Sequence, residues 1–460
     1  MTGHAMWPDM PERNEDTAFL IDFHLNGFRK LKENWEKIKK ITEEANSQDF
    51  VTFHSYEMHS CAYGDHHLVS PDKDIELLYA GSPKELLEKL KQRAIMVPHH
   101  IAYTPGYRGI DWDAYTEDIS PIVEIYSKHG LALNADAPFP YYHNMGPRDD
   151  RNTVYEGLKK GKRFGFAAST DHHAGYPGSY GDGKIAVLAE TLDRESIWQA
   201  IHERRCYAVT GDKIRCEFSG NDRPMGSILP ADTRKIDLRY KVEADYAIDK
   251  VILYKNLRPV QITNGEFLGE DTEHAGTYKL RFEFGWGNNT DALYKWDCTA
   301  EVKNAKILHH QSCFRGRNVL APHTLDTAAY DDVNAIDNKV LGKNDHEIRW
   351  QCFTTANITT LHPATQQMIL EVEGDEKSEL LLTVNGRRHH FTLRDLMKQG
   401  CTYQVKKYTS QAYKIYKALP ESSYLVTRET EDNCSSGDFY HLEVYQKNGS
   451  CAFVSPVFID

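Results

Sequence analysis

Apolar and polar residues follow two different periods along the chain, and the first half combines both. From about residue 14 to 48, apolar side chains recur every three or four positions among lysines and glutamates, which predicts a long amphipathic helix. After that helix, short apolar runs alternate with stretches of helical pattern as far as about residue 204. Such an alternation of strands and helices is typical of a parallel sheet or a β/α barrel.

The predicted elements of the first half are short. Strands are expected over residues 50–57, 94–100, 122–130, 164–173 and 184–190, and helices over residues 83–93, about 150–161 and 194–204. The helix near residue 83 has a clear start signal, because Ser82 suits the N-cap and Pro83 the first helical position. Glu85 completes a capping box with Ser82.

Beyond Gly211 the apolar period changes to two, which predicts β-strands. Asn385-Gly386 and Asn448-Gly449 each lie between strand-like flanks, and Asn-Gly is a strong signal for a tight hairpin turn. The second half is therefore expected to be mostly antiparallel, in a sandwich or two sheet layers. We expect one domain over residues 1–215 and a β-rich domain over residues 216–460.

Composition narrows the classes of protein. The 460 residues are 40% hydrophobic, with a net charge of −12 and no dense cluster of lysine and arginine, so a nucleic-acid partner is not expected. No apolar run is long enough for a membrane span or a signal peptide, which predicts a cytoplasmic protein. The expected partner is a small-molecule substrate, and no membrane partner is expected. A signal sequence lost with an upstream segment stays an alternative, and an oligomer is compatible with the sequence. The nine cysteines are scattered without a C-x-x-C pair, as reduced core residues would be.

Histidine is the unusual residue of this chain. There are 22 histidines, with His-His pairs at 66/67, 99/100, 172/173, 309/310 and 389/390. In a parallel sheet or barrel, residues at the carboxyl ends of strands gather on one face. The residues expected there are Glu57, His66, His67, His99, His100, Glu124, His129, Asp171 and His173. Imidazoles and carboxylates are ligands of Zn²⁺, Mn²⁺ and Fe²⁺, so the sequence predicts a divalent metal site.

The direction of side chains along an extended segment selects among these candidates. Asp171 and His173 point the same way and His172 points elsewhere, so His173 is the preferred ligand. For 66/67 and 99/100, one histidine of each pair is expected to point inward, without an indication of which. For Glu124 the sequence leaves three alternatives open. It is a metal ligand, a carboxylate that orients a ligating imidazole, or a residue at the exposed end of its strand. Seven other histidines are predicted to be structural: His24, His202, His274, and the pairs 309/310 and 389/390.

Several segments together resemble the PHP (polymerase and histidinol phosphatase) superfamily of metallohydrolases. They are "TGHAMWPD", "FVTFHSYE", "GDHHLV", "VPHHIAY", "VEIYSKHG", "GFAASTDHHAGYPGSYG", "RRCYAVTGDKI" and the C-terminal "DFYHLEVYQKNGSCAFVSPVFID". Within that superfamily, the chain resembles a branch of uncharacterised bacterial proteins allied to carbaryl (carbamate) hydrolases. The resemblance implies a distorted β/α barrel of about seven strand–helix units, N-terminally incomplete here, with two or three Zn, Mn or Fe ions at the strand ends.

The resemblance also implies roles for individual residues. His4 matches the histidine that follows the family's second strand, and Glu57 matches the bridging carboxylate. The other matches are His66 or His67 for the next imidazole, His99 or else His100 for the fourth motif, Asp171 with His173 for the closing Asp-x-His, and Glu124 and His129 for positions near the metals. The family's His-x-His strand, expected upstream of His4, is absent, and Gly3 stands where the superfamily has Asp. The expectation is a truncated reading or a natural short form with an incomplete site.

The predicted function is that of a metal-dependent hydrolase of a phosphoester, carboxylic ester or carbamate, with a metal-activated water at a dinuclear or trinuclear site. Glu57 and His129 are the predicted catalytic residues. Tyr103, Arg108, Tyr141 and Arg148 are predicted to line the substrate pocket. The alternatives are a catalytically impaired binding or scaffold protein, and a single structural zinc without catalysis.

Overall fold

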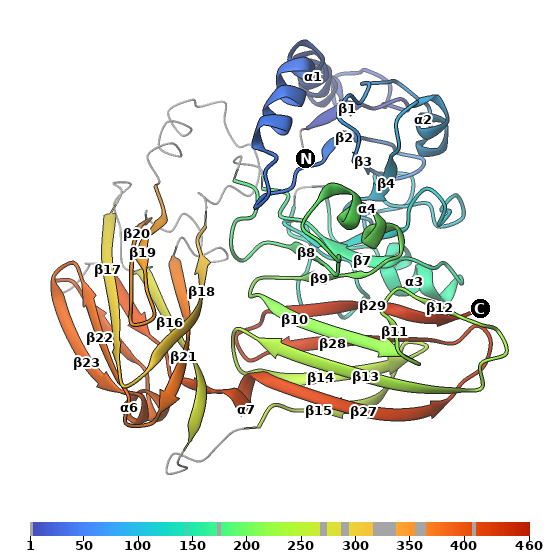
Figure 1. The fold of residues 1–460 in the computed structure, drawn as a ribbon. Coiled ribbons are helices and arrows are strands. Elements are labelled where there is room, and N and C mark those ends of the chain that lie inside the picture. The colour runs from blue at the N-terminus through green and yellow to red at the C-terminus, as the bar shows by residue number, and fades with distance from the viewer. Residues whose placement is uncertain are drawn as a thin grey trace.

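The computed structural model is built mainly from β-sheets, in three packed bodies (Figure 1). It describes residues 3–143, 145–172, 176–266, 274–286, 294–315, 337–354, 365–406 and 411–460. The N-terminal body lies above one β-sandwich, and a second sandwich lies beside the first (Figure 1). In the part of the chain that the structure describes, no helix is both long and apolar enough to cross a membrane.

The N-terminal body has two small sheets and short helices. One sheet has the order β1 (His4–Met6), β2 (His54–Met58), β3 (His66–Ser70), β4 (Ile95–Pro98), and the other the order β6 (Gly130–Leu131), β5 (Ile122–Ser127), β7 (Gly165–Ala168). The helices are α1 (Ala18–Ala45), α2 (Pro83–Lys89), the single 3-10 turn η1 (Asp150–Asn152), α3 (Val154–Lys159) and α4 (Arg194–His202). The predicted start of α2 is confirmed, since the Ser82 side chain accepts a hydrogen bond from the Glu85 amide.

The prediction of a PHP-type β/α barrel is wrong, because the described strands of the N-terminal body form two small sheets. Only the β1–β2 and β5–β7 pairs of the two small sheets are parallel, whereas β2–β3 and β3–β4 are antiparallel. A parallel pair needs a crossover connection of about a dozen residues or more, and residues 59–65 between β2 and β3 are too few for one. The apolar runs were strands, but their pairing directions depend on connections and contacts that the periodicity does not encode.

The first sandwich joins strands from both halves of the chain. One sheet has the order β11 (Arg223–Pro224), β10 (Ile214–Gly220), β13 (Lys235–Ala244), β27 (Leu425–Asn433). The facing sheet has the order β15 (Arg258–Thr263), β14 (Ile248–Lys255), β28 (Phe439–Gln446), β29 (Cys451–Ile459), β9 (Cys206–Val209), β8 (Lys184–Val187), with β12 (Ile228–Leu229) beside β29. The division expected between residues 215 and 216 therefore falls inside β10, and β8 and β9 share a sheet with C-terminal strands.

The second sandwich lies between β15 and β27 in the chain. One sheet has the order β18 (Lys306–Cys313), β21 (Gln366–Asp375), β16 (Ala275–Trp286), β25 (Ala412–Ile415), β24 (Cys401–Gln404), with β26 (Leu419–Pro420) beside β16. The other sheet has the order β19 (Lys339–Lys343), β20 (Glu347–Thr354), β17 (Tyr294–Lys303), β22 (Glu379–Val384), β23 (Arg387–Thr392). The short helices α6 (Leu393–Lys398) and α7 (Glu421–Tyr424) complete the described elements. Both predicted Asn-Gly hairpins, β22–β23 and β28–β29, are confirmed.

Shared apolar cores hold the N-terminal body against the first sandwich. Phe164 and Phe166 pack in one core with Phe453 and Phe458 of β29. All nine cysteines are free and seven of them are buried, so their predicted place as reduced, mainly core residues is confirmed. The N-terminal body, which carries the metal-ligand candidates, is therefore packed on a large β-scaffold.

Candidate metal centre

Ionisable side chains from the ends of the small-sheet strands converge in the interior of the N-terminal body. We call this set the histidine–carboxylate cluster: Glu57, Asp65, His67, His99, His100, Glu124, His129 and Asp171, all of them buried. Three overlapping groups in it place one ligand atom of each member within 4.8 Å of the others: Glu57, Asp65 and His100; His67, His99 and Glu124; His99, His100 and His129. Convergence of the strand ends, which the sequence predicted, occurs without a barrel.

Asp65 organises one side of the cluster. Its Oδ2 accepts a hydrogen bond from Arg108 Nε at 2.6 Å, and Arg108 Nη2 also contacts it. The same oxygen lies 3.3 Å from His100 Nε2 and 3.3 Å from His59 Nδ1. Although burial opposes ionisation of Asp65, the Arg108 guanidinium holds the pKa of this carboxyl well below its usual range.

Glu124 and Asp171 organise the other side. His99 Nδ1 lies 2.6 Å from Glu124 Oε1, and His99 Nε2 lies 3.5 Å from Asp171 Oδ2. Burial disfavours a charged His99, but the two carboxylates outweigh it and raise the pKa of the imidazole well above its ordinary value. His129 Nε2 is 3.0 Å from Asp171 Oδ2, and its Nδ1 is 2.6 Å from the Tyr103 hydroxyl.

The backbone is strained at the cluster. His100 has φ +33°, Arg108 +65° and Asp171 +45°, in the left-handed region that residues with a Cβ rarely adopt. Because β4 ends at Pro98 and His100 leaves the extended conformation, strand alternation does not govern the His99-His100 pair. Both rings therefore join the cluster, whereas alternation predicted one of them. Strain of this kind accumulates at functional sites.

Several imidazole nitrogens of the cluster lack hydrogen bonds. Among the described residues, neither nitrogen of His67 has a hydrogen-bond partner, and Nδ1 of His100 has none. Buried polar atoms are nearly always paired, because an unpaired one costs about 1–3 kcal/mol. Imidazole nitrogens and carboxylate oxygens that face one another in this state form a donor set suited to Zn²⁺, Mn²⁺ or Fe²⁺. The residues present therefore fit the divalent ions that the sequence predicted.

No protein-family model matches the chain. It is 28% identical over 220 residues to an uncharacterised protein of Chlamydia pneumoniae, a match that covers 44% of this chain and 35% of the relative. It is 31% identical over 172 residues to uncharacterised proteins of Chlamydia muridarum and Chlamydia trachomatis, covering 35% of this chain and 27% of each relative. The chain thus spans between 27% and 35% of the length of these relatives.

The remaining predicted ligands lie in different positions. His4 is at the edge of the cluster, with Nε2 3.3 Å from Glu57 Oε2. His66 turns away from the His67 side, and its Nδ1 lies 2.9 Å from the carbonyl oxygen of Gly64. His172 Nδ1 accepts a hydrogen bond from the Tyr176 amide at 3.2 Å. His173 lies outside the described residues.

The predicted pocket residues support the cluster from the outside. Tyr103 contacts His129, and Tyr141 packs on Tyr103 with ring centroids 4.9 Å apart. Arg108 pairs with Asp65, so its guanidinium is occupied within the protein. Arg148 donates hydrogen bonds to the backbone carbonyls of residues 131, 135, 137 and 139, which makes it a brace for that loop.

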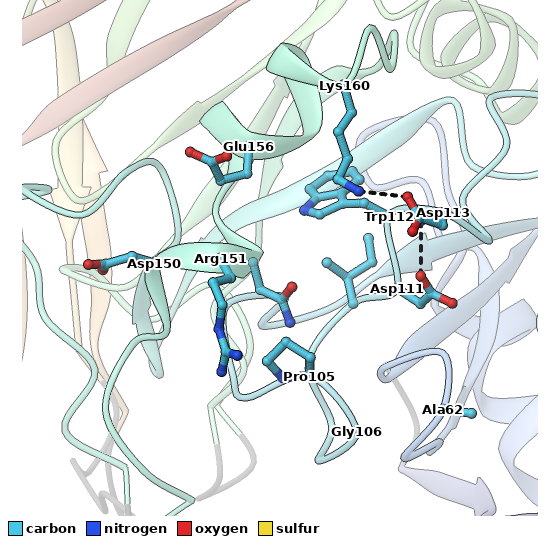
Figure 2. A pocket seen from close by; sticks show the side chains of 12 residues that line it. Ala62, Pro105, Gly106, Asp111, Trp112, Asp113, Asp150, Arg151, Glu156 and Lys160 are labelled. Carbon is cyan, nitrogen blue, oxygen red and sulfur yellow. Dashed lines mark hydrogen bonds and ion pairs between the residues drawn. The ribbon is translucent and has the colours of Figure 1, made fainter.

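A cavity of about 720 Å³ opens beside the loop that follows Tyr103 (Figure 2). Its wall includes Asp111, Trp112 and Arg151, and Lys160 bridges to Asp113 at 2.6 Å (Figure 2). No member of the cluster, within the described residues, lines this cavity. We therefore do not assign it to the chemistry of the cluster.

Three residues that could bind a metal were not among the ligands predicted from the sequence. They are Asp65, His59 and His24. Asp65 directly precedes the His66-His67 pair, and His59 follows Glu57 by two positions, so the strand-end rule would have included both. His24 lies on the buried stripe of α1 with Ile21 and Leu31, a position that a helical wheel identifies. The apolar stripe by itself predicts a structural role for a histidine at this position.

Gly109 fixes the loop that delivers Arg108. A Cβ at this position would collide with the carbonyl of Tyr103 and the side-chain amide of Asn152. We expect Gly109→Ala to destabilise the protein by about 1–3 kcal/mol through overpacking. Urea denaturation measures this, with Gly27→Ala on α1 as control, because nothing lies within 4 Å of a Cβ there. Equal unfolding free energies for the two variants would contradict this account of the loop.

His24 and His66 should each cost the metal-free protein stability as the pH falls. Burial lowers the pKa of His24 and of His66 to about 4, from 6.5 for an ordinary histidine. The unfolded chain then binds more protons than the folded one between these values, so the free energy of unfolding decreases as the pH drops from 6.5 towards 4. At about pH 5 we expect a loss of about 1–2 kcal/mol for each ring relative to about pH 7.5.

Urea denaturation in the presence of a chelator at the two pH values measures this loss. His66→Gln should reduce the difference between the two pH values by the share of one ring. A difference between the two pH values that is the same in His66→Gln and in the unaltered protein would contradict the prediction.

Proposed function

We propose that this chain is a metal-dependent hydrolase that acts on a phosphoester, a carboxylic ester or a carbamate. The observation that supports the proposal is the histidine–carboxylate cluster, in which four buried imidazoles face four buried carboxylates. When the imidazoles are neutral, as metal ligands must be, and Asp65 is offset by Arg108, the cluster carries an excess of negative charge. Divalent cations would neutralise that charge, and protein interiors rarely hold such a set without a function.

The donor groups divide between two neighbouring positions for Zn²⁺, Mn²⁺ or Fe²⁺ ions. Glu57, Asp65 and His100 would hold one ion, and His67, His99 and Glu124 would hold another. A bound divalent ion lowers the pKa of water towards about 7 and stabilises charge on the attacking and leaving oxygens of a hydrolysis. Our preferred reaction class follows from that chemistry.

The protein's own groups position the ligands and handle a proton. Arg108 fixes Asp65, and Glu124 fixes the ring orientation of His99 through Nδ1. His129 lies between Asp171 and the Tyr103 hydroxyl, so its ring can hold a proton at one nitrogen while the other is hydrogen-bonded. His129 is accordingly our candidate for the acid that assists the leaving group.

Two further features support the proposal. The segments around His4, Glu57, His99 and Asp171 resemble motifs of the PHP superfamily, and we propose that relationship for the N-terminal body without its barrel. The nine free cysteines suit a reducing compartment, so we extend the proposal to a cytoplasmic protein.

The test is an activity assay on the full chain after chelation and reloading with Zn²⁺, Mn²⁺ or Fe²⁺. The substrates are p-nitrophenyl phosphate, bis(p-nitrophenyl) phosphate, p-nitrophenyl acetate and an aryl N-methylcarbamate. We expect turnover of at least one substrate that requires metal, is lost in His99→Ala and persists in His202→Ala. Bound metal without turnover would favour a structural zinc, and absence of both would favour a binding or scaffold protein; either result overturns the proposal.

A further inference from the structure

A second group of imidazoles adjoins the cluster and contains no carboxylate. We call it the histidine triad: His4 of β1, His24 of α1 and His59, which follows β2. One nitrogen of each lies within 4.8 Å of the others. The ring centroids are 4.1 Å apart for His4 and His59, 4.9 Å for His24 and His59, and 5.5 Å for His4 and His24.

His24 lies in apolar surroundings, and His59 is fully buried beside it. His24 is 5% exposed and its ring meets Trp7 at 5.1 Å and Phe28 at 6.0 Å, and His59 is 0% exposed. Within the described residues, Nδ1 of His24 and both nitrogens of His59 make no hydrogen bond, although His59 Nδ1 lies 3.3 Å from Asp65 Oδ2. A core position against Trp and Phe is satisfied best by an apolar side chain, whereas these nitrogens stay unpaired at a cost. Their shared direction gives them one common use, which is to bind a ligand together.

The triad is separate from the positions assigned to the hydrolase. Its nearest carboxylates are Glu57, whose oxygens lie 3.3 Å from His4 Nε2 and 3.7 Å from His59 Nε2, and Asp65, whose Oδ2 lies 3.3 Å from His59 Nδ1. Glu57 thus touches both the triad and the cluster, but His4, His24 and His59 belong to none of the three groups of the cluster. Three imidazoles select a borderline metal such as Zn²⁺ over Mg²⁺ or Ca²⁺, which prefer oxygen ligands.

A cavity of about 430 Å³ reaches the triad from solvent. His4 and His24 line it, together with Phe23, Leu31, Lys30 and Asn34 along α1. Three protein ligands and an open fourth position are the arrangement of zinc sites that exchange a water or an oxygen ligand. A closed structural site would lack such an approach.

We propose that His4, His24 and His59 form a Zn²⁺ site of their own, whose remaining position faces the cavity between β1 and α1 and takes an oxygen ligand from it. The site is independent of the proposed hydrolase function, because none of its three ligands is needed for the two positions of the cluster. It also assigns a use to His24, which is otherwise an unexplained polar residue on the buried face of α1.

Cobalt titration of the full metal-free chain tests the site, since Co²⁺ replaces Zn²⁺ and its visible absorption reports a low coordination number. The variant is His24→Phe, which keeps an aromatic ring against Trp7 and Phe28 and removes both nitrogens. We expect it to bind one Co²⁺ fewer per chain than the unaltered protein, or to bind that ion at least tenfold more weakly. His202→Phe, at a ring that contacts Trp198 outside the triad, should bind as the unaltered protein does.

A second variant makes the test independent of how His24→Phe folds. His67→Ala combined with His100→Ala removes one ligand from each of the two positions of the cluster and leaves the three triad ligands in place, so one Co²⁺ with visible absorption should remain. Unchanged cobalt stoichiometry and affinity in His24→Phe, or no cobalt bound by the double variant, would overturn the proposal. Failure of the hydrolase proposal is distinguishable, because it leaves the triad's cobalt signal in place while turnover is absent.

Discussion

Replacing Glu57 by glutamine is expected to reduce metal-dependent hydrolysis by at least about 100-fold. Glu57 lies 2% exposed at the centre of the site, in one group with Asp65 and His100 and in contact with His4. The amide keeps the size of the side chain but removes a negative charge and a strong oxygen ligand. Burial also raises the pKa of Glu57 above its usual range, so metal binding at neutral pH should displace a proton from it.

The measurement combines turnover at saturating Mn²⁺ or Zn²⁺ with the metal retained after gel filtration. Glu88→Gln is the matched control, because Glu88 is an exposed residue of the nearby helix α2. Turnover and metal content of Glu57→Gln equal to those of the control would show that this carboxylate is not a ligand.

The second large expected effect is on the free energy of unfolding, at the buried ion pair of Arg281 and Asp212. Arg281 and Asp212 form a buried ion pair at 2.5 Å, and each is 5% exposed or less. The Asp212 carboxylate also accepts hydrogen bonds from Tyr180 at 2.6 Å and Asn448 at 2.6 Å, while Arg281 donates to Gln367 at 3.0 Å. This network joins the N-terminal body to both sandwiches.

Arg281→Met is expected to lower the free energy of unfolding by about 3–5 kcal/mol, because it leaves the Asp212 charge buried without its cation. Adding Asp212→Asn should recover part of the loss, since the buried charge is then removed. Arg239→Met is the control, because Arg239 pairs with Asp222 on the surface and its side chain is 50% exposed. There we expect a loss of at most about 1 kcal/mol.

Urea denaturation followed by circular dichroism measures these differences. Equal losses for Arg281→Met and Arg239→Met would mean that the buried pair contributes no more than a surface pair. A loss in the double variant that exceeds the loss in Arg281→Met would contradict the explanation from an unpaired charge.

Local signals in the sequence predicted local structure well. Asn385-Gly386 fixes the β22–β23 hairpin because Asn and Gly both adopt positive φ there, at 46° and 80°. Ser82 fixes the start of α2 through its own backbone neighbours. Pairing direction is not local, and so nothing in the apolar run of β3 indicates that it lies antiparallel to both β2 and β4.

The sequence likewise predicted part of the candidate site, namely the residues that follow directly from their place at a strand end. Strand ends placed Glu57, His99 and Asp171 near one another without any need for the barrel. The inclusion of His100 depends on its φ of +33°, which a rule of alternation cannot foresee. His24 required the buried face of a helix to be compared with a strand distant in the chain, which only the tertiary structure supplies.

The central claim is that the histidine–carboxylate cluster binds divalent metal ions, and the metal content of the purified full chain tests it most directly. Inductively coupled plasma mass spectrometry after gel filtration should find a stoichiometric transition metal in the unaltered protein. The His99→Ala and Asp171→Asn variants should contain less of it, and the His202→Ala control should contain as much as the unaltered chain. A folded protein without stoichiometric metal, which also binds no Zn²⁺ or Mn²⁺ on titration, would contradict the claim.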